Sequence, residues 1–263
     1  MPVHRIALAL DITRIREEKL HGFEGALVTT PERDVGEILI NSHSSHPRRR
    51  FTIGHELGHF LNPWHKPIAG ARFECTRADM ALGDSQSGPT RTRHQRQELE
   101  ANLFAIELLT PRPRLRPHLA HDPDLRHALQ VAEEFEISKE AAVRRYVALH
   151  EAKLAVVFSR DQMFVYVERG PEFPSLALRK GHPTPPLAEA QSNRTRSEWE
   201  AADPADWLAR PQPGPLYTQT LHQQNGYRTT LLFIETVEDE GDEGDDHDGL
   251  QVPFGRRFAR RDR

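Results

Sequence analysis

The chain has 263 residues and carries 35 lysines and arginines against 39 aspartates and glutamates, a formal net charge of −4. This length allows one large domain or two ordinary ones, each with a buried core. No run of about 18 apolar residues is present, which predicts no membrane span, and the apolar stretch at residues 6–10 is too short for a signal peptide. The single cysteine excludes an intramolecular disulfide. Together these features predict a cytoplasmic protein.

The start of the chain combines a helical pattern with short strand patterns. Apolar residues at helical spacing predict a helix over residues 7–20, and residues 26–29 and 37–41 read as short strands. We expect the strand at residues 37–41 to be a sheet edge, against which a peptide substrate lies extended.

Two longer helices follow. Residues 51–61 and 95–109 each carry apolar side chains at helical spacing. Residues 110–117 contain three prolines, at positions 111, 113 and 117, which predicts a helix stop and a loop, because proline cannot continue a helix.

A helix-turn-helix-like pair is predicted over residues 125–134 and 138–150. Arg144 and Arg145 on its second helix could contact phosphate or bases and support weak DNA binding. The alternative is that both helices simply pack to complete a domain that covers residues 1–150.

The pattern becomes β-rich from residue 151 to about residue 237. The sequence Gln-Asn-Gly at residues 224–226 predicts a tight hairpin between two of the strands. We expect a small accessory domain that is either regulatory, substrate-recruiting or a packing appendage. The predicted strands are residues 154–158, 163–168, 175–179, 216–222 and 227–235.

The last segment, residues 238–263, is acidic and then basic. Eight of the eleven residues at 238–248 are acidic, and five of the last ten are arginine. This predicts a solvated, disordered tail behind a mildly basic body.

Residues 55–59 read His-Glu-Leu-Gly-His, a HExxH motif on the predicted helix 51–61. Residues four apart share a helix face, so His55 and His59 can present two imidazoles to one ion. Zinc lowers the pKa of a bound water from about 15.7 to about 7, and Glu56 can take its proton as the water attacks a peptide carbonyl. The 15 histidines of the chain make accidental motifs more frequent, but the apolar periodicity of this helix favours a metal site.

A catalytic zinc site needs a third protein ligand and an open fourth position. His65 lies ten residues after His55, a spacing that some zinc peptidases use. Glu98 lies on the helix 95–109, four residues before Asn102, which could support the site from behind the ligands. Glu100 points to another side of the same helix, and all three candidates stay open on the residues alone.

The segments around these residues read PRRRFTIGHELGHFL over residues 47–61 and ELEANLFAIELLTP over residues 98–111. They resemble the ImmA/IrrE family of zinc metallopeptidases, whose patterns are close to RFTxAHELGH and ExxANxFAxELLxP. The departures are Gly54 for the usual alanine and Thr110 for the usual methionine. The resemblance covers roughly residues 20–150.

The resemblance implies an α+β, zincin-like catalytic domain, followed here by the small β-rich domain. It implies one catalytic Zn²⁺ held by His55, His59 and Glu98, with Glu56 as the catalytic base. It also implies an intracellular endopeptidase that cleaves a helix-turn-helix transcriptional repressor and so derepresses stress, DNA-damage or mobile-element genes. The alternative is a DNA- or protein-binding regulator with a structural or vestigial metal site, although a vestigial site would usually have lost Glu56.

Cys75 lies between the two motif helices, in the long polar segment at residues 67–95. Loops over active sites often act as lids. If the Cys75 thiolate bound the ion, it would occupy the open coordination position and inactivate the enzyme. The alternative is an inert, small buried side chain.

Overall fold

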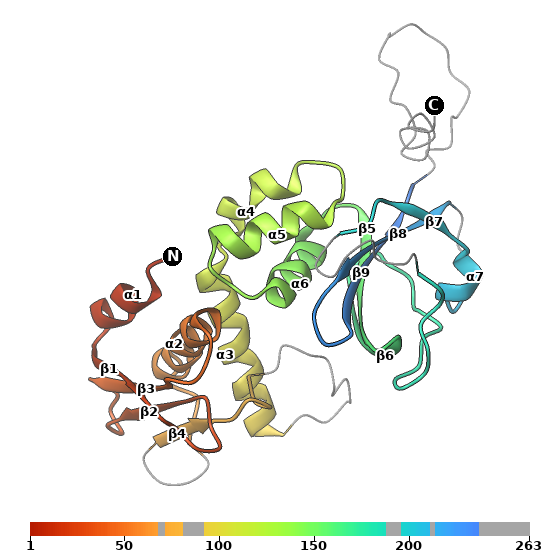
Figure 1. Ribbon diagram of the computed structural model, residues 1–263. Helices are drawn as coiled ribbons and strands as arrows, with labels where there is room; N and C mark the ends of the chain where they lie inside the picture. The colour runs from red at the N-terminus through yellow and green to blue at the C-terminus, as the bar shows by residue number, and fades with distance from the viewer. Residues whose placement is uncertain (68–71, 81–91, 188–195, 211–213, 237–263) are drawn as a thin grey trace, which may run out of the picture. The chain divides into compact units, whose positions relative to one another are not determined.

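The structure is a computed structural model that divides into two compact units (Figure 1). The predicted tail, residues 238–263, lies outside the described residues. The described residues are 1–67, 72–80, 92–187, 196–210 and 214–236. The first unit comprises Met1–Ala120 and Leu129–Ala142, and the second comprises His121–Ala128 and Val143–Arg263.

The first unit is built on a four-stranded sheet with the order β1-β3-β2-β4. β1 runs parallel to β3, whereas β2 is antiparallel to both of its neighbours. Residues of β3 alternate between buried and half-buried, as expected for a strand with one covered face. The strands are β1 (Ile12–Glu18), β2 (Gly25–Thr29), β3 (Gly36–Asn41) and β4 (Arg72–Cys75).

Two predictions for this sheet are wrong. The strand at residues 37–41 exists, but β3 pairs with β1 on one side and β2 on the other, so the edges among the described strands are β1 and β4. The single helix predicted over residues 7–20 is instead the short α1 (Val3–Ala9) followed by β1. Asp11 has a φ of 64°, in the left-handed region, and it ends the helical course of the chain between the two elements.

Helix α2 (His46–Leu61) begins five residues before the predicted start at residue 51. Pro47 stands in its first turn, where a missing backbone N–H costs no hydrogen bond. Helix α3 (Arg93–Leu109) begins with a capping box, in which the side chains of Thr92 and Gln95 each accept the other residue's backbone N–H.

Helices α2 and α3 lie side by side (Figure 1) because small residues line their contact. A Cβ on Gly54 would lie 3.3 Å from the Cα of Ala105, and a Cβ on Gly58 would lie 3.2 Å from the Cα of Ala101. Gly54, which stands where the family pattern has alanine, therefore lies at the contact between α2 and α3.

Three shorter helices follow in the chain. The region predicted as a loop at residues 110–117 contains α4 (Arg112–Leu119), which tolerates Pro113 in its first turn but also carries Pro117 inside. Helices α5 (Leu125–Glu134) and α6 (Lys139–Leu149) match their predicted positions closely.

Arg144, one of the two candidate DNA contacts on α6, is engaged within the second unit. Its Nε and Nη2 donate to Glu168 Oε2 at 2.9 and 2.7 Å. The guanidinium is therefore committed to a charge-assisted pair with β6 rather than presented as a free contact for DNA.

The second unit contains a five-stranded antiparallel sheet with the order β6-β5-β9-β8-β7. The hairpin prediction is confirmed, since Asn225 and Gly226 both have positive φ between β8 and β9. Residues 175–179 form no strand and make only an isolated bridge, Leu176 to Leu208. The elements are β5 (Lys153–Arg160), β6 (Met163–Arg169), β7 (Glu200–Ala202), α7 (Pro204–Trp207), β8 (Leu216–His222) and β9 (Tyr227–Ile234).

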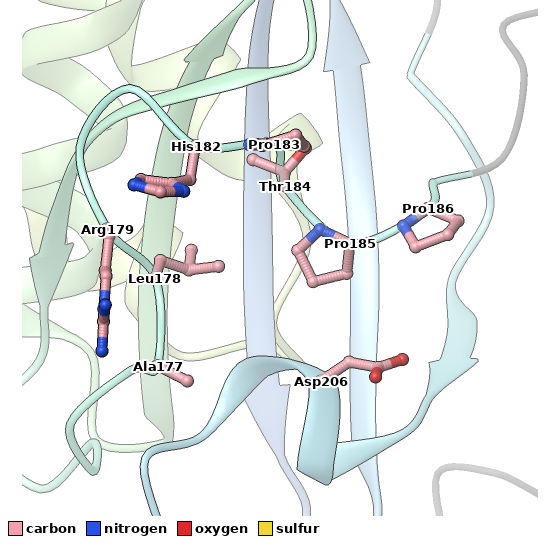
Figure 2. Close-up of a pocket in the computed structure, with 9 residues that line it drawn as sticks. All are labelled: Ala177, Leu178, Arg179, His182, Pro183, Thr184, Pro185, Pro186 and Asp206. Carbon is pink, nitrogen blue, oxygen red and sulfur yellow. The ribbon is translucent and has the colours of Figure 1, made fainter.

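A hollow of about 450 Å³ lies in the second unit, where the segment from Ala177 to Pro186 passes the short helix α7. Figure 2 shows Arg179 and His182 together on one side of it and Asp206 on the other. Within the described residues, the metal-ligating groups gather elsewhere, in the first unit.

The fold is thus an α+β unit followed by a β-rich part, as predicted. Within the part of the chain that the structure describes, no helix is long and apolar enough to cross a membrane.

Candidate metal centre

Helix α2 places the three polar residues of the HExxH motif in the interior. His55, Glu56 and His59 are all fully buried. Because His55 and His59 are one turn apart, their imidazoles face the same way, and their Nε2 atoms lie 3.1 Å from each other. Two unprotonated nitrogens at this distance are arranged to share one cation.

Glu98 reaches the same point from α3. Its Oε2 lies 3.2 Å from His55 Nε2, and its Oε1 lies 3.4 Å from His59 Nε2. Glu98 is only 5 % exposed, so its carboxylate is buried together with the two imidazoles. The close packing of α2 against α3 brings the acidic group within reach of both histidines.

The donor spacings fit a zinc ion. Zn–N and Zn–O bonds of about 2.0–2.2 Å in a tetrahedron place the ligand atoms about 3.3–3.6 Å apart. The separations between His55, His59 and Glu98 run from 3.1 to 3.4 Å. Two imidazoles and a carboxylate are also a donor set that catalytic zinc uses.

A fourth donor, Cys75, belongs to the same cluster. Its Sγ lies 3.6 Å from His59 Nε2, and the ligand atoms of Cys75, His55, His59 and Glu98 all lie within 4.8 Å of one another. The segment 67–95 is not a simple loop, because Cys75 ends β4 and pairs with Gly25 of β2. Residues 68–71 and 81–91 of that segment, where a lid was expected, lie outside the described residues.

The buried imidazole of His55 is oriented by Asn102. His55 Nδ1 lies 2.9 Å from Asn102 Oδ1, and Asn102 Nδ2 donates to the carbonyl of Asp79 at 2.9 Å. The amide thus presents its oxygen to the ring, which puts the histidine proton on Nδ1 and leaves Nε2 free for an ion.

His59 is supported in the same way by the two rival candidates for third ligand. Its Nδ1 lies 2.9 Å from His65 Nδ1, and His65 Nε2 lies 2.9 Å from Glu100 Oε2. A proton on His59 Nδ1 and another on His65 Nε2 satisfy this chain and leave His59 Nε2 free. The structure therefore places His65 and Glu100 behind a ligand rather than in the cluster.

Two residues of the site were missed by sequence reasoning. His94 Nδ1 lies 3.4 Å from Glu98 Oε1 and its Nε2 lies 3.3 Å from Asp79 Oδ1. The capping-box pattern at Thr92 could have shown that α3 starts early enough to place His94 one turn before Glu98.

Arg33 is the other missed residue. Its guanidinium donates to the carbonyls of His59, Phe60, Asn62 and His65, at 3.2 Å for Phe60 and 2.6 Å for Asn62. A cation on the last carbonyls of a helix satisfies acceptors that have no partner in the helix. Arg33 thus holds the turn that carries His65, and no local pattern in the sequence marks this long-range role.

Glu56 is buried but points to no hydrogen-bond donor. Neither of its carboxylate oxygens has a partner among the described residues. The carboxylate fits against β2 because residue 25 is glycine: a Cβ there would lie 2.8 Å from Glu56 Oε1 and 2.3 Å from Thr52 Cγ2. Burial raises the pKa of Glu56 well above its usual value; the neighbouring Cys75 thiol opposes this shift, and the Glu98 charge adds to it.

The electrostatics of the other donors differ. Burial lowers the pKa of His59 to about 4, so the imidazole is neutral and keeps a lone pair at neutral pH. Burial opposes ionisation of Glu98, but its contacts with His55 and His59 outweigh burial and lower the pKa of this carboxyl. Burial and the Glu56 and Glu98 charges raise the pKa of the Cys75 thiol. Without a cation, burial therefore favours the neutral forms of Glu56 and Cys75, and Glu98 carries the negative charge of the cluster.

Residues 11–147 match the Peptidase M78 family, described as the IrrE N-terminal-like domain. The chain belongs to this family. The resemblance seen in the two motifs is confirmed, and the matched residues form an IrrE-type metallopeptidase domain that includes the whole metal cluster.

The other comparisons add less. No curated protein matches the chain. Among solved structures, the chain is similar to a Mycobacterium tuberculosis transcriptional regulator, with 12 % identity, a TM-score of 0.49, and coverage of 92 % of this chain and 86 % of that one.

Proposed function

We propose that this chain is a zinc-dependent endopeptidase. His55, His59 and Glu98 would hold the ion, and Glu56 would act as the catalytic base. The observation that carries the proposal is the convergence of these three donors, at separations of 3.1–3.4 Å, beside the buried Glu56 carboxylate, whose oxygens have no hydrogen-bond partner among the described residues.

The division of labour follows from the geometry. A zinc ion held here would supply an acidified water and a Lewis acid for the scissile carbonyl. Glu56 lies one residue from His55 on the same helix, and neither of its oxygens is occupied by a donor. It can therefore accept a proton from the attacking water and return it to the leaving amine. Asn102 and His65 keep the two imidazoles in the tautomer that binds the ion.

We propose a helix-turn-helix transcriptional repressor as the substrate, whose cleavage would derepress stress, DNA-damage or mobile-element genes in the cytoplasm. Membership of the IrrE-type family supports this proposal. Cleavage of the repressor would be the regulatory event, and DNA contact by Arg144 is not needed for it.

The test is Glu56→Gln, with a candidate repressor as substrate and cleavage followed by intact-protein mass spectrometry. Loss of the base should lower the rate about 10²–10⁴-fold. The amide is nearly isosteric, so the variant should still bind one equivalent of zinc, which metal analysis checks. Undiminished cleavage by Glu56→Gln would contradict the mechanism.

A second candidate is a regulator whose metal site is only structural. The presence of Cys75 in the cluster favours it, because four protein ligands are typical of structural zinc. If neither the parent chain nor Glu56→Gln cleaves any candidate repressor while both bind it or its operator DNA, this second function replaces the first.

A further inference from the structure

Cys75 lies close enough to His55, His59 and Glu98 to be a fourth ligand of one ion, because the four ligand atoms all lie within 4.8 Å of one another. Zn–S bonds of about 2.3 Å and Zn–N bonds of about 2.0–2.1 Å put the two ligand atoms about 3.5–3.6 Å apart. The observed separation between Cys75 Sγ and His59 Nε2 is 3.6 Å. The same tetrahedron accounts for the contacts of His59 with His55 and with Glu98, at 3.1 and 3.4 Å.

The backbone on both sides of the thiol is held. Before it, β4 pairs with β2, and the Cys75 carbonyl accepts the Glu24 N–H at 2.9 Å. After it, Asp79 Oδ2 accepts the Thr76 N–H at 2.8 Å and closes a turn. Asn102, whose other amide atom contacts His55, donates to the Asp79 carbonyl. The segment that carries Cys75 is therefore tied to the same side chain that orients a ligand.

The position of Cys75 also accounts for the buried Glu56 carboxylate beside it. A structural zinc site needs four ligands and no base, yet the unpartnered Glu56 carboxylate is buried next to the thiol. A catalytic site needs that carboxylate and an open position. Both features are present together if the thiol occupies the open position reversibly.

We propose that Cys75 is the fourth ligand of the ion and that its sulfur closes the position a catalytic zinc keeps open, which makes the folded chain a latent peptidase. A bound divalent ion deprotonates a coordinating thiol. The peptidase becomes active when the thiolate leaves the ion. This inference rests on the proposed zinc site at His55, His59 and Glu98.

Cobalt(II) spectroscopy tests the ligand directly. The metal-free full-length chain is titrated with Co²⁺, and the near-ultraviolet band of thiolate-to-cobalt charge transfer is followed together with the visible bands of tetrahedral cobalt. Because Cys75 is the only cysteine in the chain, such a band can arise only from this residue. We expect a band that saturates at one equivalent in the parent chain.

The variants separate ligation from packing. Cys75→Ser and Cys75→Ala should lose the charge-transfer band and keep visible bands of three-ligand cobalt. Both variants should bind zinc more weakly. The loss should be at least as large as the roughly 10–100-fold loss that follows removal of a residue that only supports a ligand. A thiol moved to the loop after β3, as Ser42→Cys in the Cys75→Ala background, should not restore the band. If the Cys75 variants fail to fold, the band in the parent chain alone decides.

The outcomes distinguish the two proposals. Visible cobalt bands without a charge-transfer band in the parent chain would overturn the Cys75 inference and leave the three-ligand site intact. No cobalt or zinc binding by the parent chain would overturn both. At saturating zinc, cleavage of a candidate repressor should be faster in Cys75→Ala than in the parent chain, and an equal or lower rate would overturn latency even where the band is present.

Discussion

The two histidines of the cluster are held by different outer partners, an amide for His55 and a second histidine for His59. Each partner does the same work, because it fixes the proton on Nδ1 and turns Nε2 toward the ion. His65 has the sequence spacing of a metal ligand, but here its side chain supports His59, which is itself a proposed ligand. Residue type and spacing alone therefore do not separate a ligand from its support.

The ligand assignment predicts different results for Glu98→Ala and His65→Ala. Removing Glu98 takes away a direct donor, so the purified variant should no longer retain stoichiometric zinc. Removing His65 takes away only the support of His59, so zinc should bind to one equivalent at saturation, about 10–100-fold more weakly. Metal analysis after dialysis and a competition titration measure both. The reverse pattern would make His65 the third ligand.

His150 predicts a pH dependence that is independent of the metal. Its Nδ1 accepts the Ala152 N–H at 3.0 Å and its Nε2 contacts the His121 carbonyl at 3.3 Å, so the neutral ring uses both nitrogens. Burial lowers its pKa, against the pull of that carbonyl and of Glu151 and Asp122. The folded chain therefore binds this proton less readily than the unfolded chain, and the free energy of unfolding should fall as the pH drops below about 6.5.

The measurement is the denaturant midpoint of the parent chain and of His150→Gln between about pH 7.5 and 5.5. The advantage of the parent chain should be full above pH 6.5 or so and should shrink below it, by at most about 1.4 kcal/mol per pH unit. His43→Gln, at an exposed position, serves as the control with no such effect. An advantage that grows on acidification would show that His150 gains rather than loses a partner when protonated.

Among the elements, β2 sets how closely the sheet approaches helix α2, which carries the HExxH motif. Gly25→Ala should push β2 from α2, because the added Cβ would lie 2.3 Å from Thr52 Cγ2 and 2.8 Å from Glu56 Oε1. Overpacking of this kind typically costs about 1–3 kcal/mol. Urea denaturation of the metal-free chain measures the loss in the free energy of unfolding.

Thr52→Ser supplies the matched control for that prediction. It removes the methyl group that the new Cβ would meet first, so the double variant should recover part of the stability lost by Gly25→Ala. Strictly additive losses would show that β2 and α2 do not clash there.

Much of this arrangement could be predicted from local patterns, and the remainder depends on tertiary contacts. The HExxH spacing on an apolar-periodic helix was enough to bring His55 and His59 together. Selecting Glu98 among three candidates depends on which face α3 turns toward α2, and this is decided by the glycine contacts with Ala101 and Ala105. The residue spacing alone left that choice open.

The wrong elements have equally specific causes. Residues 12–18 show an apolar spacing that fits a helix, yet they form a strand that pairs in parallel with β3. The local sequence does not reveal this pairing, because the partner strand lies further along the chain. The position of Cys75 beside His55, His59 and Glu98 depends likewise on the pairing of β4 with β2. Among the described residues of the polar segment 67–95, only the first part forms a strand. The sequence alone predicts a loop there, because it does not show which strand pairs with it.

At the scale of the whole molecule, the cluster of His55, His59, Cys75 and Glu98 and the β-rich sheet lie in different compact units. All four donors of the cluster belong to the first unit, and they come from α2, β4 and α3, three consecutive elements of the chain. The second unit has its own apolar core, which includes Trp207, Phe164 and Phe173. An ion should therefore stabilise one unit and leave the stability of the other nearly unchanged.

Hydrogen exchange with and without a chelator tests this separation. At free zinc about 100 times the dissociation constant, binding adds about 2.7 kcal/mol to the unit that holds the ion. Amides of α2 and α3 that exchange by opening of the whole unit should therefore exchange about 100-fold faster after zinc is removed. Amides of β5, β8 and β9 should keep their rates. Equal acceleration in both units would mean that they open as one cooperative body, and no acceleration in α2 or α3 would mean that zinc does not bridge these elements.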